Sequence, residues 1–113
     1  MDDLESVFVN ANGIRFHCKT GGNGPLCLFV HGFSDTHLTF HHQAPKLARS
    51  CRVVVPEMRG YGRTDAPKKF ADYRLPLLVD DLRGIIKAFG EEQAAIIAHD
   101  WGATIAVTTS CLL

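Results

Sequence analysis

The segment IIAHDWGA, residues 96–103, places a carboxylate where a buried strand is followed by a helix. Ala98 and Gly102 stand two positions before and after Asp100. Small residues at these two positions allow the strand and the helix to approach closely in a tight turn. Such a turn raises its central side chain to an exposed apex, and the N-terminus of the next helix directs backbone N–H groups towards it. The pattern predicts that Asp100 is a nucleophile.

Aspartate at the apex favours a different chemistry from serine, so Asp100 argues against a serine esterase. Serine must lose its proton to a base before it attacks, whereas a carboxylate near a helix N-terminus is ionised at neutral pH. Asp100 could attack a saturated carbon that carries a leaving oxygen or halide, and water would then hydrolyse the resulting ester. The second step develops an oxyanion, for which we expect the backbone N–H groups of Trp101 and Phe33 as donors.

Simpler interpretations exist for each of these residues. An aspartate at a helix start is most often only an N-cap, and Trp101 could be a core residue. A second loop, HGFS, follows another apolar strand, and its presence favours the catalytic interpretation of Asp100. We expect His31, Gly32, His99 and Gly102 to support the two loops, with the side chain of His99 pointing away from the site.

The elements that would position these loops follow from hydrophobic patterning. Asn12-Gly13 is the strongest short hairpin signal and separates two alternating segments. Three continuous apolar runs predict strands that are covered on both faces. The expected strands are 6–10, 13–21, 26–30, 51–55 and 94–98.

The clearest helix is expected over residues 75–90. Its apolar residues recur every three or four positions, Pro76 suits its first turn and Gly90 the position just after its end. The charged residues Asp80, Asp81, Arg83 and Lys87 lie off the apolar stripe. A helix weakened by a proline is expected within 40–49, and another after the Asp100 turn.

Apolar strands that alternate with helices predict an α/β fold with a mostly parallel sheet, helices on both faces and an antiparallel N-terminal hairpin. In such sheets, chemistry takes place beyond the carboxyl ends of the strands. Both the HGFS loop and the HDWGA segment directly follow the carboxyl end of an expected strand.

Composition limits the remaining function classes. Twelve basic and twelve acidic residues cancel, which gives no indication of nucleic-acid or membrane-surface binding. No apolar run is long enough to span a bilayer, and the acidic N-terminus lacks a signal pattern. The four cysteines form no metal pattern and read as buried small residues in a reducing compartment, so we expect a cytoplasmic protein without metal or cofactor.

The combination of HGF, RGYGRTDAP and AHDWGA, in this order, resembles the α/β-hydrolase fold family and specifically its epoxide hydrolase branch. The resemblance runs from about residue 7 to the end. It implies that Asp100 is the nucleophile, that Phe33 and Trp101 are the oxyanion donors, and that the substrate is a small-molecule epoxide. Glu57 stands where the family usually has an aspartate, and we assign it no catalytic role.

The resemblance also implies that parts of the enzyme lie beyond residues 1–113. The family places its catalytic histidine, its partner acid and two lid tyrosines later in the chain. We therefore expect residues 1–113 to be the N-terminal part of the domain, truncated after the nucleophile turn, and to be inactive and poorly stable alone. The alternatives are a haloalkane or haloacetate dehalogenase of the same fold, which uses the same aspartate chemistry, and a non-catalytic truncated isoform. Phe33 argues against the haloalkane enzyme, whose typical residue there is asparagine.

Overall fold

The computed structural model describes residues 4–32, 40–99, 102–103 and 105. They form one five-stranded sheet with the order β1-β2-β4-β3-β5. The elements are β1 (Glu5–Ala11), β2 (Ile14–Gly21), β3 (Leu26–Val30), α1 (Gln43–Leu47), β4 (Arg52–Pro56), the 3₁₀ helix η2 (Phe70–Tyr73), α2 (Leu75–Ala88) and β5 (Ala95–Ala98).

The N-terminal hairpin forms as the sequence predicts. Asn12 and Gly13 connect β1 to β2 with φ angles of 52° and 74°. Positive φ at both central residues is the requirement of the type I′ turn, whose twist matches that of the strands it joins. The hairpin pairs in antiparallel register from Glu5↔Thr20 to Ala11↔Ile14, and β2 then pairs antiparallel with β4.

The three apolar runs form the parallel part of the sheet. β3 lies between β4 and β5 and pairs parallel with both. All five residues of β3 are buried, as expected for a strand with helices over both faces. The α/β fold and the strand positions are therefore confirmed, with boundaries that differ from the expected ones by at most one residue.

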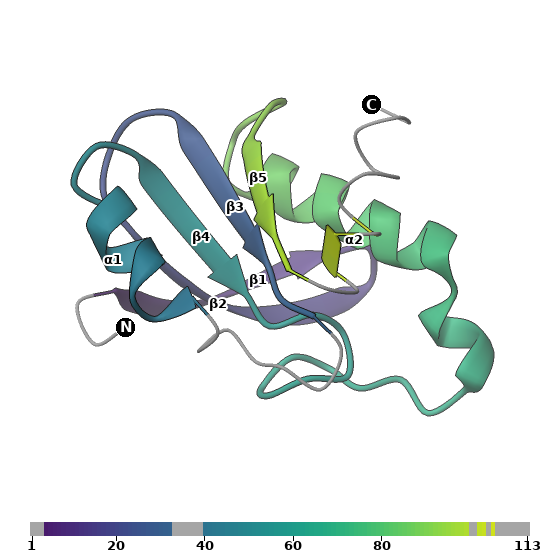
Figure 1. Ribbon diagram of the computed structural model, residues 1–113. Helices are drawn as coiled ribbons and strands as arrows, with labels where there is room; N and C mark the ends of the chain where they lie inside the picture. Colours follow the sequence, from purple (N-terminus) through teal and green to yellow (C-terminus); the bar gives the residue numbers. More distant parts are fainter. Residues whose placement is uncertain (1–3, 33–39, 100–101, 104, 106–113) are drawn as a thin grey trace.

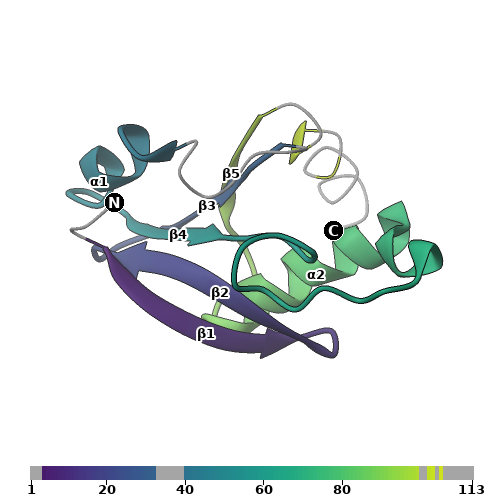
Figure 2. The same ribbon diagram turned by 90° about the horizontal axis from the view of Figure 1, so that it is seen from below.

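The two helices cover opposite faces of the sheet (Figures 1 and 2). Successive β3 side chains point to alternate faces, so Leu28 packs in the core beneath α2 and Phe29 in the core beneath α1. The α2 core is the larger one and takes in Leu82 and Ile85. α1 contains Pro45 and is only five residues long, which agrees with the predicted weakness of that segment.

The ends of α2 carry the expected signals. Pro76 lies in its first turn, where a missing N–H costs nothing. Gly90 has a φ of 82° and its N–H donates to the Lys87 carbonyl oxygen at 2.9 Å, while the Glu91 N–H donates to that of Ile86 at 3.2 Å. These bonds satisfy carbonyl groups that the helix end leaves open.

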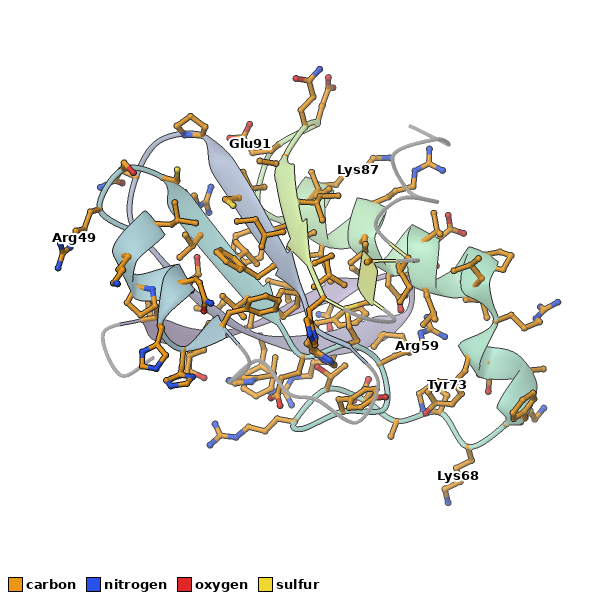
Figure 3. All side chains as sticks on the ribbon, viewed as in Figure 1. Arg49, Arg59, Lys68, Tyr73, Lys87 and Glu91 are labelled. Carbon is orange, nitrogen blue, oxygen red and sulfur yellow. The ribbon has the colours of Figure 1, made fainter. Side chains whose placement is uncertain are left out.

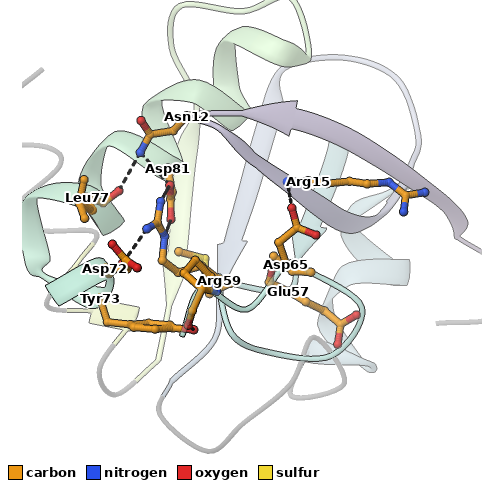
Figure 4. A network of polar contacts seen from close by, with 12 residues as sticks. Asn12, Arg15, Glu57, Arg59, Asp65, Asp72, Tyr73, Leu77 and Asp81 are labelled. Carbon is orange, nitrogen blue, oxygen red and sulfur yellow. Dashed lines mark hydrogen bonds and ion pairs between the residues drawn. The ribbon is translucent and has the colours of Figure 1, made fainter. Parts of the chain in front are cut away.

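One expectation about α2 is wrong. The sequence pattern predicts that Asp81 lies off the buried stripe, yet the residue is 0% exposed. The reason is Arg59, in the loop after β4, whose Nε and Nη2 each donate to an Asp81 carboxylate oxygen at 2.6 Å. Asn12 Nδ2 donates to the same carboxylate at 2.9 Å (Figure 4). Three donors compensate the burial of this carboxylate.

Arg59 also reaches η2, because its Nη1 donates to the Asp72 carbonyl oxygen at 2.6 Å. Figure 3 shows Arg59 and Tyr73 close to the N-terminal end of α2. The Arg59–Asp81 pair therefore joins the hairpin turn, the loop after β4, η2 and α2. This network fixes the loop that passes beside the carboxyl ends of the strands.

The cysteines that the structure describes are unpaired thiols, as expected of small apolar residues. Cys18 and Cys27 are buried and Cys51 is half-buried. Burial raises the pKa of Cys18 to about 12, which keeps the thiol protonated and unreactive at neutral pH. Over the described ranges, no helix combines the length and apolar character needed to cross a bilayer.

Candidate active site

The two loops predicted to carry the chemistry leave the sheet side by side. β3 and β5 are parallel neighbours with Val30 opposite Ala98, so both strands end at the same edge. The His99 N–H donates to the Val30 carbonyl oxygen at 3.1 Å. The pairing thus continues one residue past β5 and brings the start of the HGFS loop against the start of the HDWGA turn.

The three residues to which we assigned the reaction, Asp100, Phe33 and Trp101, lie outside the described residues. Their roles stay predictions. Of the supporting residues, His31 and Gly32 follow β3 directly, His99 follows β5 with an exposed side chain, and Gly102 is helical. The structure therefore describes the residues that flank the turn, His99 before it and Gly102 after it.

The backbone at Gly102 passes very close to the end of β3. A Cβ atom added there would lie 2.4 Å from the Val30 carbonyl oxygen and 2.6 Å from that of His31. Both atoms belong to the backbone and cannot rotate away. The predicted need for a small residue two positions after Asp100 thus has a direct cause in the contact between the turn and β3.

Replacing Gly102 with alanine should destabilise the protein by about 1–3 kcal/mol, since the new methyl group forces β3 and the turn apart. Denaturant unfolding measures the change. Gly21→Ala is a matched control, because its Cβ would meet the Leu4 side chain at Cδ2, 2.8 Å away, which can move. Equal losses in the two variants would contradict the proposed contact.

His31 is a structural residue of this edge. The Met58 N–H donates to its Nε2 at 3.0 Å, so Nε2 is an acceptor and the ring proton lies on Nδ1. Nδ1 is 2.9 Å from the Gly32 carbonyl oxygen and donates to it. With 2% exposure and both nitrogens bonded, the neutral ring ties the loop after β3 to the loop after β4.

A cavity of about 540 Å³ adjoins this edge. Its wall runs from the loop after β3, through the loop after β4, to η2 and α2. The lining is mostly apolar and aromatic, and its members include Gly32, Tyr61, Phe70, Tyr73, Leu78 and Ile105. Its volume lies in the range of small-molecule sites, which are typically about 300–1,000 Å³.

Sequence reasoning missed a buried polar pair on the hairpin side of the same loop. His17 Nδ1 lies 2.6 Å from Glu57 Oε1, and both side chains are at most 4% exposed. The Thr64 hydroxyl joins their backbones, because it accepts from the His17 N–H at 3.0 Å and donates to the Glu57 carbonyl oxygen at 2.5 Å. No short-range pattern could reveal a contact between residues forty positions apart. Among the described side chains, no group of three or more potential ligands is placed to hold a metal ion.

Comparison with known proteins gives a consistent assignment. Residues 25–112 match the family described as the α/β hydrolase fold. The chain is 38% identical over 107 residues to epoxide hydrolase 3 of Siraitia grosvenorii, which covers 94% of this chain and 34% of the relative. It is also 38% identical over 109 residues to the AB hydrolase superfamily protein YfhM of Bacillus subtilis.

Among solved structures, a variant of the Vigna radiata epoxide hydrolase superposes with a TM-score of 0.95 at 38% identity. The match covers 99% of this chain and 36% of the other. The chain thus spans about a third of the length of the curated relatives it matches.

Proposed function

The chain belongs to the α/β hydrolase fold family, where it matches the N-terminal part of the epoxide hydrolase branch, and on this premise we propose that the protein hydrolyses epoxides to diols. The observation that carries the proposal is the meeting of two motif-bearing loops at one edge of the sheet. The HGF loop after β3 and the HDWGA turn after β5 start in direct backbone contact.

In the proposed reaction, the Asp100 carboxylate attacks an epoxide carbon. The C–O bond of the ring breaks as an alkyl ester forms on the enzyme, and the ring oxygen takes a proton from a lid tyrosine of a later segment. Water then gives a proton to the histidine of a later segment and attacks the ester carbonyl, while the N–H groups of Phe33 and Trp101 stabilise the oxyanion. As this intermediate collapses, the leaving oxygen takes the proton from the histidine, the diol is released and the carboxylate is restored.

Three described residues support this assignment of roles. The Met58–His31–Gly32 hydrogen bonds hold the backbone directly before Phe33 in a fixed course. A fixed course is what an oxyanion donor requires, because its N–H must point at the developing charge before the reaction starts. The adjoining cavity has room for a small organic substrate.

We further propose that residues 1–113 are the N-terminal part of a longer hydrolase domain. The catalytic histidine, its partner acid and the lid tyrosines would then come from later segments. We also propose that the protein is cytoplasmic and binds its substrate without a cofactor. Within the described part of the sheet, β5 pairs only with β3, so its other edge is open for a further strand.

Expressed without further segments, residues 1–113 should aggregate and should not turn over epoxide. An open apolar strand edge invites pairing with other chains. Each Leu or Ile side chain left uncovered forfeits about 1.5–3 kcal/mol of burial, against a typical total stability of about 5–15 kcal/mol. Size exclusion, thermal melting and an epoxide assay test this. A monomer with a cooperative melt would refute the stability argument, and multiple turnovers would refute the assignment of the base to a later segment.

A substrate panel tests the epoxide assignment on the full-length protein. We expect diol formation from a styrene-type epoxide or a fatty-acid epoxide, and no halide release from a chloroalkane or from fluoroacetate. Both dehalogenases would use the same aspartate, so only the products separate the three activities. Halide release without diol formation would assign the protein to the dehalogenases.

A further inference from the structure

A second chain of polar groups lies on the N-terminal hairpin, among residues that the proposed epoxide reaction does not use. Ser6 Oγ is hydrogen-bonded to His17 Nε2, and His17 Nδ1 is 2.6 Å from Glu57 Oε1. Serine, histidine and carboxylate thus stand in the order in which a base activates a hydroxyl and an acid orients the base. Ser6 itself is exposed, while the other two residues are buried.

The strand register explains how the three residues meet. Phe8 lies directly opposite His17 across the hairpin, and Ser6 is two residues before Phe8 on the same face of β1. Ser6 is therefore the diagonal neighbour of His17, within reach of a side chain as long as histidine. Glu57 follows the end of β4, and its N–H donates to the His17 carbonyl oxygen at 2.9 Å.

Neighbouring groups hold the Glu57 carboxylate in place. The Arg63 N–H donates to Oε1 at 3.2 Å. Gly62 lies directly against the carboxylate, since a Cβ atom there would fall 1.5 Å from Oε2. A carboxylate fixed in this way keeps the ring proton on Nδ1, which leaves Nε2 to accept the Ser6 proton. This is the tautomer that general-base activation of a serine needs.

We propose that Ser6 is a second nucleophile of this protein, which takes the acyl group of small activated esters. Ser6 Oγ attacks the ester carbonyl carbon as its proton moves to His17 Nε2, and Nδ1–H stays bonded to Glu57. The C–O bond to the leaving group then breaks, the leaving alkoxide takes the proton from Nε2, and acyl-Ser6 remains. A small ester suits the site because Ser6 lies on an open strand face.

A fluorophosphonate probe tests the proposal on the full-length protein. Ser6 would displace fluoride, with its proton passing through His17 to solvent, and would retain a stable phosphonyl group. Trypsin cleaves after Arg15, and Ser6 is the only serine among residues 1–15. An adduct on the peptide that ends at Arg15 is therefore assigned to Ser6. Ser50, an exposed serine before β4, is the internal reference. General-base activation predicts that Ser6 is labelled about 100-fold faster than Ser50.

Variants separate activation from simple exposure. Ser6→Ala should remove the label from residues 1–15, and His17→Gln and Glu57→Gln should slow the labelling of Ser6 to the rate of Ser50. Circular dichroism checks that each variant is folded. Equal labelling rates at Ser6 and Ser50 in the unmodified protein would overturn the proposal, and this comparison does not depend on the folding of any variant. Labelling of Ser6 at an unchanged rate in folded His17→Gln would overturn it as well.

Discussion

Replacing Asp100 with alanine in the full-length protein should lower kcat for epoxide hydrolysis by about 10⁴-fold or more, the loss typical when an enzyme's covalent nucleophile is removed. Alanine leaves neither a carboxylate to attack the epoxide carbon nor an amide that could hydrolyse back to aspartate. Binding of the substrate should change much less, because the cavity beside the site is lined mainly by apolar and aromatic residues.

Steady-state kinetics on the purified variant measure the loss. Asp80→Ala is the matched control, because Asp80 is an exposed carboxylate on α2 that lies 3.9 Å from Arg83 at its nearest approach. That variant should keep its activity within about twofold, as surface substitutions usually do. A variant at Asp100 that retains more than a tenth of the activity would exclude this residue as the nucleophile.

The covalent step has a separate signature. Quenching a single turnover should trap an alkyl ester on the peptide that contains Asp100. In water enriched with ¹⁸O, repeated turnovers should place the label in the Asp100 carboxylate, because solvent attacks the carbonyl of the ester. Absence of both the adduct and the label would leave direct attack by water on the epoxide as the mechanism.

The sequence predicted most of the fold because its signals are local. The Asn12-Gly13 turn, the apolar runs of β3, β4 and β5 and the stripe of α2 each lie within one short segment. The parallel pairing followed from the alternation of strands and helices. The order of strands in the sheet could not be predicted, since it depends on which apolar faces fit together.

The polar networks were missed for the opposite reason. Glu57 stands in a loop after a strand, and nothing near it in the sequence indicates that His17 is its partner. Asp81 is part of an Asp-Asp pair on a helix whose charged residues otherwise read as a solvated face. Its burial is decided by Arg59 and Asn12, which are 22 and 69 positions away in the chain.

The conformation of the backbone around the candidate site was partly predictable. The need for a small residue at Gly102 followed from the strand-to-helix turn and agrees with the close contact to β3. The exact tautomer of His31 did not follow, because it depends on the Met58 N–H from another loop. Roles at Asp100, Phe33 and Trp101 came from the motif and the resemblance, and they await the kinetic tests.

The largest effect on stability is expected at Arg59. Arg59→Met should lower the free energy of unfolding by about 3–5 kcal/mol, the usual cost of removing one partner from a buried ion pair. Burial raises the pKa of the Asp81 carboxyl, and the hydrogen bonds from Arg59 and Asn12 oppose that rise. Without Arg59, the carboxylate keeps its burial and loses its two strongest donors.

Urea unfolding of the full-length protein at about pH 7 measures the loss. Arg83→Met is the matched control, because the Arg83 side chain is 40% exposed and its nearest contact with Asp80 is 3.9 Å. This variant should lose no more than about 0.5 kcal/mol. Adding Asp81→Leu to Arg59→Met should recover part of the loss, since it removes the stranded charge.

The loss should also depend on pH, in a direction fixed by Asp81. In Arg59→Met the pKa of Asp81 rises further above its value in the unfolded chain, about 3.9. The native variant then binds more protons than the unfolded chain between these two values, so its stability falls as the pH rises through that window. The destabilisation relative to the unmodified protein should therefore be smaller at about pH 4 than at about pH 7. A loss that is equal at both values would mean that packing of the arginine, rather than its charge, supports Asp81.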